Sequence, residues 1–231
     1  MRILAVETAT SQQSVAILED SEVLGSQRID AQGSHTRRLI PTIDALLQSL
    51  QLKLVDMTGL AVSIGPGSFT GLRAGLATMT GFRVALNLPL VTVPTLEAMA
   101  WNFRVEHQLV YPMLKARSNE LYWAGFRWEM GELRRVTDDQ VGSIETLLQS
   151  LKEPVLSLGE GWLHCQHAIK ELSPLLSSAP SDTHMASAVS VGLASLQRFA
   201  SGDVAAVGVT PRYILPPYAE IQKRDVKSQA V

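Results

Sequence analysis

The order of secondary-structure signals repeats along this 231-residue chain, and that repeat limits its fold more than any single motif does. Three short β-rich runs, at residues 2–8, 14–19 and 23–29, are separated by polar turns. A helical pattern follows at 35–50, then an apolar run at 60–64 and a glycine-rich helix. From residue 109 the order of three strands, helix, strand and helix begins again. The halves share this pattern rather than residues, which indicates a structural duplication.

Two similar sets of strands and helices predict an α/β protein with the duplicated actin-like (ASKHA or RNase H-like) fold. Each of its two similar subdomains has a mixed sheet and helices. We expect the boundary near residue 105, with subdomains at 1–105 and 106–231. No low-complexity linker separates them, so the halves are expected to pack closely. The proline-containing last residues are expected to pack back in part and then fray.

Charge and composition narrow the class of protein. The formal net charge of −2 supplies no basic field that would attract nucleic acid. The single cysteine, Cys165, excludes an intrachain disulfide and fits a reducing compartment. The N-terminus lacks a signal-peptide pattern, and no apolar run approaches the ~20 residues of a membrane span. We therefore expect a cytoplasmic protein without a membrane anchor.

The stretch SIGPGSFTGLRAGLATMTGF, residues 63–82, resembles a phosphate-binding loop but lacks its chemistry. A P-loop requires a lysine after its second glycine, and no lysine occurs here. The dinucleotide fingerprint fails as well, because the third glycine comes one residue late. A tight strand-to-helix turn is therefore favoured, in which Gly65 and Gly67 provide positive φ angles.

The helix after this turn carries small residues along one side. Gly71, Gly75 and Thr78 fall at spacings of four and three, and glycine inside a helix costs about 1 kcal/mol relative to alanine. Such a stripe permits close approach of a neighbour, either inside the chain or in another subunit. We predict that this helix and the helix at 35–50 form a partner surface. The candidate interface residues are His35, Leu39, Ile43, Gly71, Gly75, Thr78 and Phe82.

Five motifs, in order, are similar to the TsaB (YeaZ) family, bacterial proteins needed to make threonylcarbamoyladenosine in tRNA. They are ILAVETAT, HTRRLIPTIDALL, IGPGSFTGLRAGLATMTGF, VPTLEAMA and PRYIL. The resemblance implies an actin-like fold and a heterodimer with the paralogue TsaD, which transfers the threonylcarbamoyl group to the adenosine beside the anticodon. It also implies an assembly with the ATPase TsaE, indirect contact with tRNA, and a non-catalytic role. We expect a homodimer when the partner is absent.

The same resemblance predicts that no metal is bound. The catalytic paralogue carries His-x-x-x-His after its fifth strand, and the matching positions here are Thr95 and Met99. A threonine hydroxyl and a thioether are poor ligands for zinc or iron in a nitrogen and oxygen site. We therefore expect no catalytic residue, no metal and no cofactor on this chain alone. Binding of ATP or ADP is expected only in the assembled complex.

One set of polar residues keeps an alternative open. Glu7, Thr8 and Thr10 follow the first strand, where actin-like ATPases place groups beside phosphate. The favoured alternative is that they satisfy amides of the turn. The second candidate function is an independent ATP-dependent phosphotransferase or a glycoprotease-like hydrolase. The chain shows only weak phosphate loops and no evident nucleophile with a base.

Overall fold

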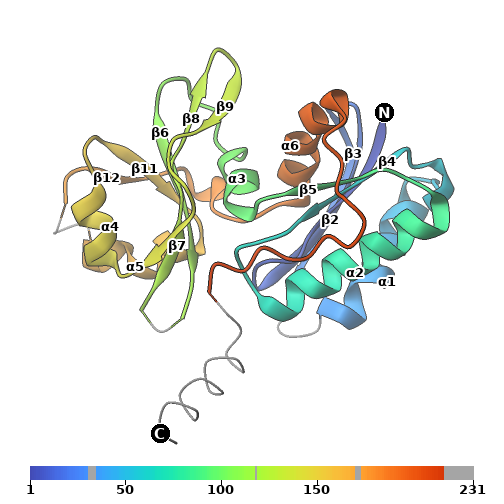
Figure 1. The fold of residues 1–231 in the computed structure, drawn as a ribbon, viewed down its shortest axis with the longest axis horizontal. Helices are drawn as coiled ribbons and strands as arrows, with labels where there is room; N and C mark the ends of the chain where they lie inside the picture. The colour runs from blue at the N-terminus through green and yellow to red at the C-terminus, as the bar shows by residue number, and fades with distance from the viewer. Residues whose placement is uncertain (31–34, 118, 170–172, 216–231) are drawn as a thin grey trace, which may run out of the picture.

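Two β-sheets form the centre of the molecule in the computed structural model, which describes residues 1–30, 35–117, 119–169 and 173–215 (Figure 1). The first sheet has the order β3-β2-β1-β4-β5. Strands β1 and β2 pair antiparallel, as do β2 and β3, whereas β4 and β5 run parallel to β1. Its strands are β1 (Arg2–Glu7), β2 (Gln12–Glu19), β3 (Glu22–Asp30), β4 (Gly59–Ser63) and β5 (Leu90–Val93).

The second sheet repeats this order, with two of its strand positions broken. Its order is β10-β7-β6-β11-β12, while β8 pairs with both β6 and β9. Because β7 and β8 both pair antiparallel with β6, they share one strand position. The strands are β6 (Leu109–Lys115), β7 (Leu121–Trp123), β8 (Phe126–Glu129), β9 (Glu132–Arg135), β10 (Gln140–Gly142), β11 (Val155–Leu158) and β12 (Leu176–Ser178). The predicted duplicated α/β architecture is confirmed.

The sequence missed two features of this sheet. The β-rich runs at 121–129 and 133–139 predict one strand each, but the first is divided into β7 and β8, and the second ends at Arg135, before β10 begins at Gln140. At the break, Gly125 N–H donates to Thr137 Oγ1 (2.7 Å) and Val136 N–H donates to Gly125 O (2.8 Å), so these bonds replace the regular ladder. The short strand β12 was not predicted, because two of its three residues are serines.

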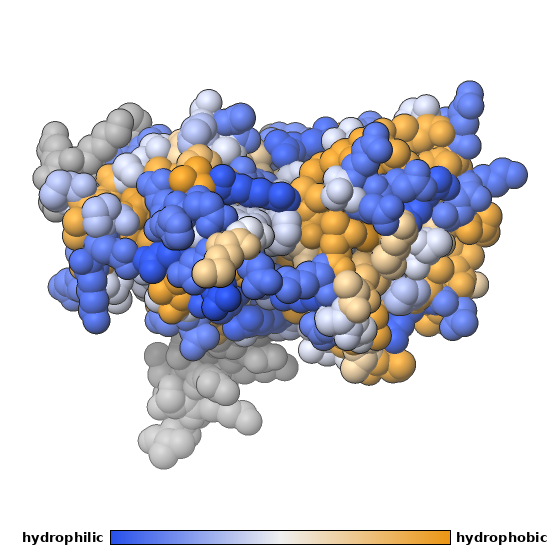
Figure 2. Space-filling model, turned by 90° about the horizontal axis from the view of Figure 1, so that it is seen from above, coloured by the Kyte–Doolittle hydropathy of each residue, from blue (hydrophilic) through white to orange (hydrophobic). Residues whose placement is uncertain are grey.

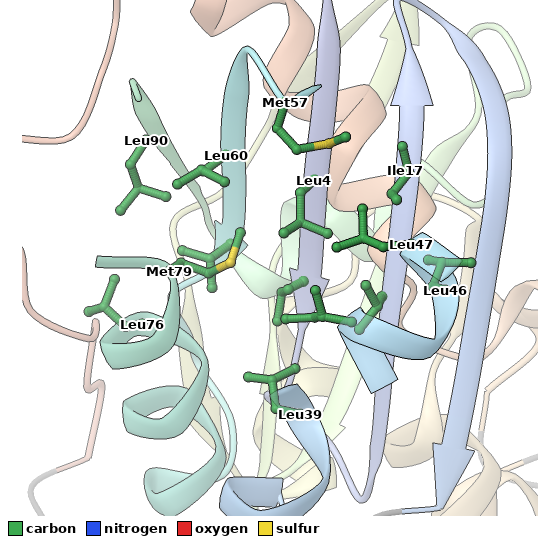
Figure 3. Packing of buried hydrophobic residues seen from close by; sticks show 14 residues of the cluster. Leu4, Ile17, Leu39, Leu46, Leu47, Met57, Leu60, Leu76, Met79 and Leu90 are labelled. Atoms are coloured by element: carbon green, nitrogen blue, oxygen red, sulfur yellow. The ribbon is translucent and has the colours of Figure 1, made fainter. Parts of the chain in front are cut away.

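Helices α1 (His35–Ser49) and α2 (Phe69–Leu86) pack together on one face of the first sheet (Figure 1). Helix α1 begins at the predicted residue. Alternate residues of β1 explain the burial of both faces of the sheet: Leu4 points to the α1–α2 side, and Ile3 belongs to a separate core on the other side. Figure 3 shows Leu39 and Leu47 of α1 and Met79 of α2 pointing toward the sheet.

Two helices pack on the sheet of the other half. Helix α3 (Thr95–Ala100) follows the first sheet in the chain but packs on β6 of the second. Helix α6 (Ala188–Ser201) follows the second sheet but covers the free face of the first, against β1, β2, β4 and β5. The expected boundary at residue 105 falls between α3 and β6 and stays a prediction.

The remaining helices are α4 (Ile144–Ser150) and α5 (Glu160–Ile169), with short 3₁₀ turns at Leu54–Asp56 and Ser181–Thr183. Residues 203–215, the C-terminal strap, then return to the first sheet. Ala205 N–H donates to Leu90 O and Arg212 N–H donates to Ile64 O, both at 2.7 Å. The predicted fraying concerns residues 216–231, which lie outside the described part. Within the described ranges, no helix has the length and apolarity to cross a bilayer.

Candidate functional site

The glycine-rich turn has the conformation that the sequence predicted. Gly65 and Gly67 have φ angles of +116° and +152°, which residues other than glycine rarely adopt. The turn leads into α2, where the Ser68 hydroxyl accepts a hydrogen bond from Gly71 N–H (3.2 Å) as the helix N-cap. A Cβ added at Gly67 would meet the carbonyl oxygen of Ala9. The turn therefore lies directly on the loop between β1 and β2.

Two of the glycines inside α2 face this same loop rather than a partner. Gly71 and Gly75 are buried, and a Cβ at either position would strike Thr8, at its carbonyl oxygen and its hydroxyl respectively. Their assignment to a subunit interface is therefore wrong. The same assignment is wrong for Leu39 and Ile43. Both are at most 2 % exposed and belong to the core between the two helices and the first sheet.

The other predicted interface residues have different outcomes. Phe82 is half-buried and packs against the same core, and Thr78 is half-buried on α2. Residue 35 begins α1, but its side chain lies outside the described part of the chain. For Thr78, Phe82 and His35, a role at an interface stays a prediction.

Among the exposed residues of the two helices, which include the polar Arg37, Asp44 and Gln48, is a set of apolar and mostly small residues. Val84 is 78 % exposed and Ile40 is 55 % exposed, and a Cβ at Gly81 would have no neighbour within 4 Å. We call this the α1–α2 surface. Its exposed apolar residues are Ile40, Pro41, Ala45, Ala77, Gly81, Val84 and Ala85. In the view of Figure 2, hydrophobic residues are also more frequent over the first body, built on the first sheet, than over the second.

Glu7 and Thr10 make hydrogen bonds within the β1–β2 turn, whereas the buried Thr8 hydroxyl has no hydrogen-bond partner. Glu7 Oε1 accepts a hydrogen bond from Ala9 N–H (2.6 Å), and the Thr10 hydroxyl donates to Gln12 O (3.2 Å). Burial raises the pKa of Glu7 to about 7, and the charge of Glu160 adds to that effect. Glu7 and Thr8 are at most 1 % exposed, so neither is accessible to a nucleotide here.

Two cavities flank the glycine turn. The larger, of about 670 Å³, has walls from residues 66–69, from β6 and β7, and from the strap. The smaller, of about 450 Å³, is lined by Thr10, Ser11 and Glu160 among others. Gly67, Ser68 and Lys115 line both. Thr10 thus borders open space, and a nucleotide beside it stays a prediction.

The contact between Ser178 and His184 is arranged unlike a catalytic pair. His184 Nδ1 accepts the Gly159 N–H (3.0 Å), so the proton of the neutral ring is on Nε2. That nitrogen, 3.4 Å from Ser178 Oγ, can donate to the serine but cannot remove its proton. Burial lowers the pKa of His184, which favours the neutral ring. The pair therefore orders a loop and cannot activate a nucleophile.

The positions matched to the paralogue's metal ligands have structural roles. The Thr95 hydroxyl accepts the Gly65 N–H (3.1 Å), and Met99 lies fully buried in the core of the second body. The described residues contain no group of three or more His, Cys, Asp or Glu side chains able to hold a metal. Absence of a metal in the purified protein stays a prediction.

Two contacts near the site could not be found from the sequence. Glu97, beside the matched positions, pairs with Arg198 of α6 at 2.9 Å and with Arg135 of β9 at 4.0 Å. The segment PRYIL reaches the glycine turn through Tyr213, whose ring stacks on Phe69 at 5.0 Å. The motif PRYIL marked the segment that contains Tyr213 but did not show what it contacts. Nothing in the sequence indicated the ion pairs of Glu97.

Comparison with known proteins gives consistent matches. Residues 25–217 match the family model described as TsaD, tRNA N6-adenosine threonylcarbamoyltransferase. The tRNA threonylcarbamoyladenosine biosynthesis protein TsaB of Escherichia coli is 32 % identical over 171 residues, 70 % of this chain and 72 % of that protein. TsaB of Haemophilus influenzae is 30 % identical over 226 residues, 93 % of each chain.

A solved structure from Pseudomonas aeruginosa, described as a protein with similarity to peptidase YeaZ, is 25 % identical with a TM-score of 0.77. The match covers 93 % of this chain and 99 % of that one. Together with the family model and the repeated strand order, it confirms the predicted actin-like fold.

Proposed function

Since the chain belongs to the TsaB (YeaZ) family, we propose that it acts as a non-catalytic subunit in the formation of threonylcarbamoyladenosine in tRNA. Its relatives in E. coli and H. influenzae carry that pathway in their names. The transferase TsaD, whose family model also matches this chain, is the partner that the proposal assigns to it. We place the protein in the cytoplasm, where it contacts tRNA through the complex.

The observation that carries the proposal is the α1–α2 surface. Large apolar side chains such as Val84 and Ile40 stand exposed there, beside the open position at Gly81. Large apolar side chains that stay exposed on two packed helices indicate a candidate interaction site. Small residues let a partner's helix approach closely, so we propose that TsaD docks its own helices on this surface. Without TsaD, a second copy of the chain covers it and forms a homodimer, and TsaE joins the assembled complex.

Two features support a non-catalytic role over an independent hydrolase. The Ser178–His184 contact has the wrong proton arrangement for general-base catalysis. Thr95 and Met99, at the paralogue's metal positions, are committed to a backbone hydrogen bond and to the core. The chain is therefore better suited to support a partner enzyme than to catalyse a reaction by itself.

Gly81→Arg tests the proposal by placing a long charged side chain in the middle of the α1–α2 surface. Because nothing lies near that position and arginine favours helix more than glycine does, the variant should fold. We expect its affinity for the TsaD paralogue from the same organism to fall at least about tenfold, measured by titration.

Met130→Arg is the control, since Met130 is 94 % exposed in the second body. This variant should pair with TsaD as the wild type does. Pairing of Gly81→Arg at wild-type affinity would refute the assigned surface. If wild-type chain and TsaD, with TsaE and substrates, modify tRNA no better than TsaD and TsaE without this chain, the function itself is refuted.

A further inference from the structure

The C-terminal strap runs from the end of α6 across the first body and ends where the two bodies meet (Figure 1). Along this path it is bonded to the first body. Ala205 N–H donates to strand β5, and Arg212 N–H donates to the segment after β4. The Tyr213 ring stacks on Phe69 with centroids 5.0 Å apart, and its hydroxyl accepts a hydrogen bond from Arg73 Nε at 2.9 Å. These contacts fasten the strap to the first body.

The last described residues of the strap also touch the second body. The Arg212 guanidinium lies 3.4 Å from the carboxylate of Asp139, in the turn between β9 and β10. Ile214 and Leu215 are half-buried and pack against the core of the second body. The same segment lines the larger cavity, whose other walls come from the glycine turn and from β6 and β7. The strap is therefore the wall of this cavity that spans from one body to the other.

The contact between Arg212 and Asp139 can separate without leaving a buried charge unpaired. The Arg212 side chain is 46 % exposed, so water solvates it when it leaves. Asp139 is 1 % exposed, but its other oxygen bonds to Arg135 of its own body at 2.6 Å. Asp139 Oδ2, which faces Arg212, has no hydrogen-bond partner among the described residues, so this contact is ionic only. Breaking a buried pair is costly mainly when it strands one charge, and here Arg135 remains.

The ion pair between α3 and α6 has the same property. Glu97 lies 2.9 Å from Arg198, but it also lies 4.0 Å from Arg135, and Arg198 lies 3.6 Å from Asp203. Each partner of this pair thus has a second partner nearby. Because Arg135 contacts both Glu97 and Asp139, the two ion pairs that link the bodies form one network. Such a network can adjust to a change in the angle between the bodies while every buried charge keeps a partner.

We propose that the strap is a releasable latch, in which the contact of Arg212 with Asp139 holds the two bodies closed over the larger cavity. When this contact breaks, the second body swings away about the packed helices α3 and α6, and the cavity opens. The strap stays on the first body, because its backbone hydrogen bonds and the Tyr213 stack are made there. The latch goes beyond the proposed function and does not depend on it, since both bodies and the strap belong to one chain.

Electron paramagnetic resonance distance measurements on the full-length chain test the latch. Thr70→Cys at the start of α2 and Asn119→Cys in the turn after β6 place one spin label at an exposed position of each body, and Cys165→Ser prevents a third label. With the latch intact, one short distance should dominate. Arg212→Met should raise the ratio of long to short distances about twofold to fivefold, the usual effect of losing an exposed ion pair. Arg212→Lys keeps the charge and should keep the wild-type distribution.

Arg28→Met, an equal loss of charge at an exposed position of β3, is the matched control and should leave the distances unchanged. Asp139→Asn should lengthen them as Arg212→Met does, and the double variant should add little, because both changes remove one contact. Thermal melting verifies that each variant is folded.

Hydrogen exchange follows the strap itself in Asp139→Asn. The Arg212 amide should stay protected there, because its bond to Ile64 O lies within the first body. Wild-type distances in Arg212→Met would overturn the latch, and so would an equal shift in Arg28→Met. Loss of protection at the Arg212 amide would overturn the assignment of the strap to the first body. None of these results bears on pairing with TsaD.

Discussion

At the scale of single residues, two glycines of α2 have opposite surroundings. Gly75 is buried against Thr8, whose hydroxyl occupies the space that a Cβ would need. Gly81, six residues later, has nothing within 4 Å of that space. The first glycine is required by a close approach within the chain, and the second leaves room on the α1–α2 surface.

Gly75→Ala should therefore destabilise the protein although alanine favours helix by about 1 kcal/mol. Overpacking against Thr8 typically costs about 1–3 kcal/mol, which offsets or exceeds that gain. Thr8→Ala removes the obstructing hydroxyl, so the double variant should regain much of the stability lost in Gly75→Ala. Urea denaturation of the four proteins measures this coupling.

Gly81→Ala is the control for this cycle and should raise stability by up to about 1 kcal/mol, because the added methyl group meets no atom. Strictly additive effects of Gly75→Ala and Thr8→Ala would contradict the assigned contact.

Glu7 should make stability depend on pH. Burial raises its pKa from 4.5 to about 7 in the folded protein. Between these pH values the folded state keeps a proton that the unfolded state has released, so stability falls as pH rises. The contribution is fully present below pH 4.5 and is lost as pH rises through about 7, a change of roughly 3 kcal/mol.

Glu7→Gln removes the titrating group and keeps the acceptor for Ala9 N–H. The difference in unfolding free energy between Glu7→Gln and wild type should grow in favour of the variant from pH 5 to pH 8. Urea denaturation across this range measures it. A difference that stays constant with pH would show that Glu7 does not titrate in the folded protein within that range.

At the scale of elements, α2 has three sides with different neighbours. Leu72, Leu76 and Met79 lie buried toward the sheet. Gly71 and Gly75 meet the β1–β2 turn. The third side carries Ala77, Gly81 and Val84 to solvent. Of the two neighbours that the small-residue stripe left open, the structure has the one inside the chain, and it is the β1–β2 turn.

The helices α3 and α6 connect the two bodies through an ion pair as well as by packing. Glu97 of α3 pairs with Arg198 of α6, at 2.9 Å, with both side chains at most 25 % exposed. The residues are 101 positions apart in the chain. This ion pair therefore helps to hold the second half of the chain to the first.

At the scale of the whole molecule, the exchange of helices makes the halves interdependent. Without α6, one face of the first sheet would expose Ile3, Leu18 and Val91, all fully buried in the intact chain. A fragment of residues 1–105 alone should therefore lack a cooperative thermal transition and should bind a hydrophobic dye. Adding the fragment 106–231 should restore the transition. Cooperative melting of fragment 1–105 by itself would contradict this dependence.

The local features of this protein could be predicted from its residues. Apolar periodicity located most strands and helices and their repeated order, and the two turn glycines indicated positive φ at Gly65 and Gly67. Each of these depends on residues close together in the chain, where spacing and backbone sterics are sufficient. The five short motifs also indicated the family to which the chain belongs.

The parts of the site that depend on distant residues could not be predicted in this way. Arg73 and Tyr213 bond across 140 positions, and Gly75 faces Thr8 instead of a partner. The periodicity of a helix shows that one side is small or apolar, but it does not say what lies against that side. Only the packed fold settles that, because contacts between distant segments depend on which surfaces the two sheets leave free.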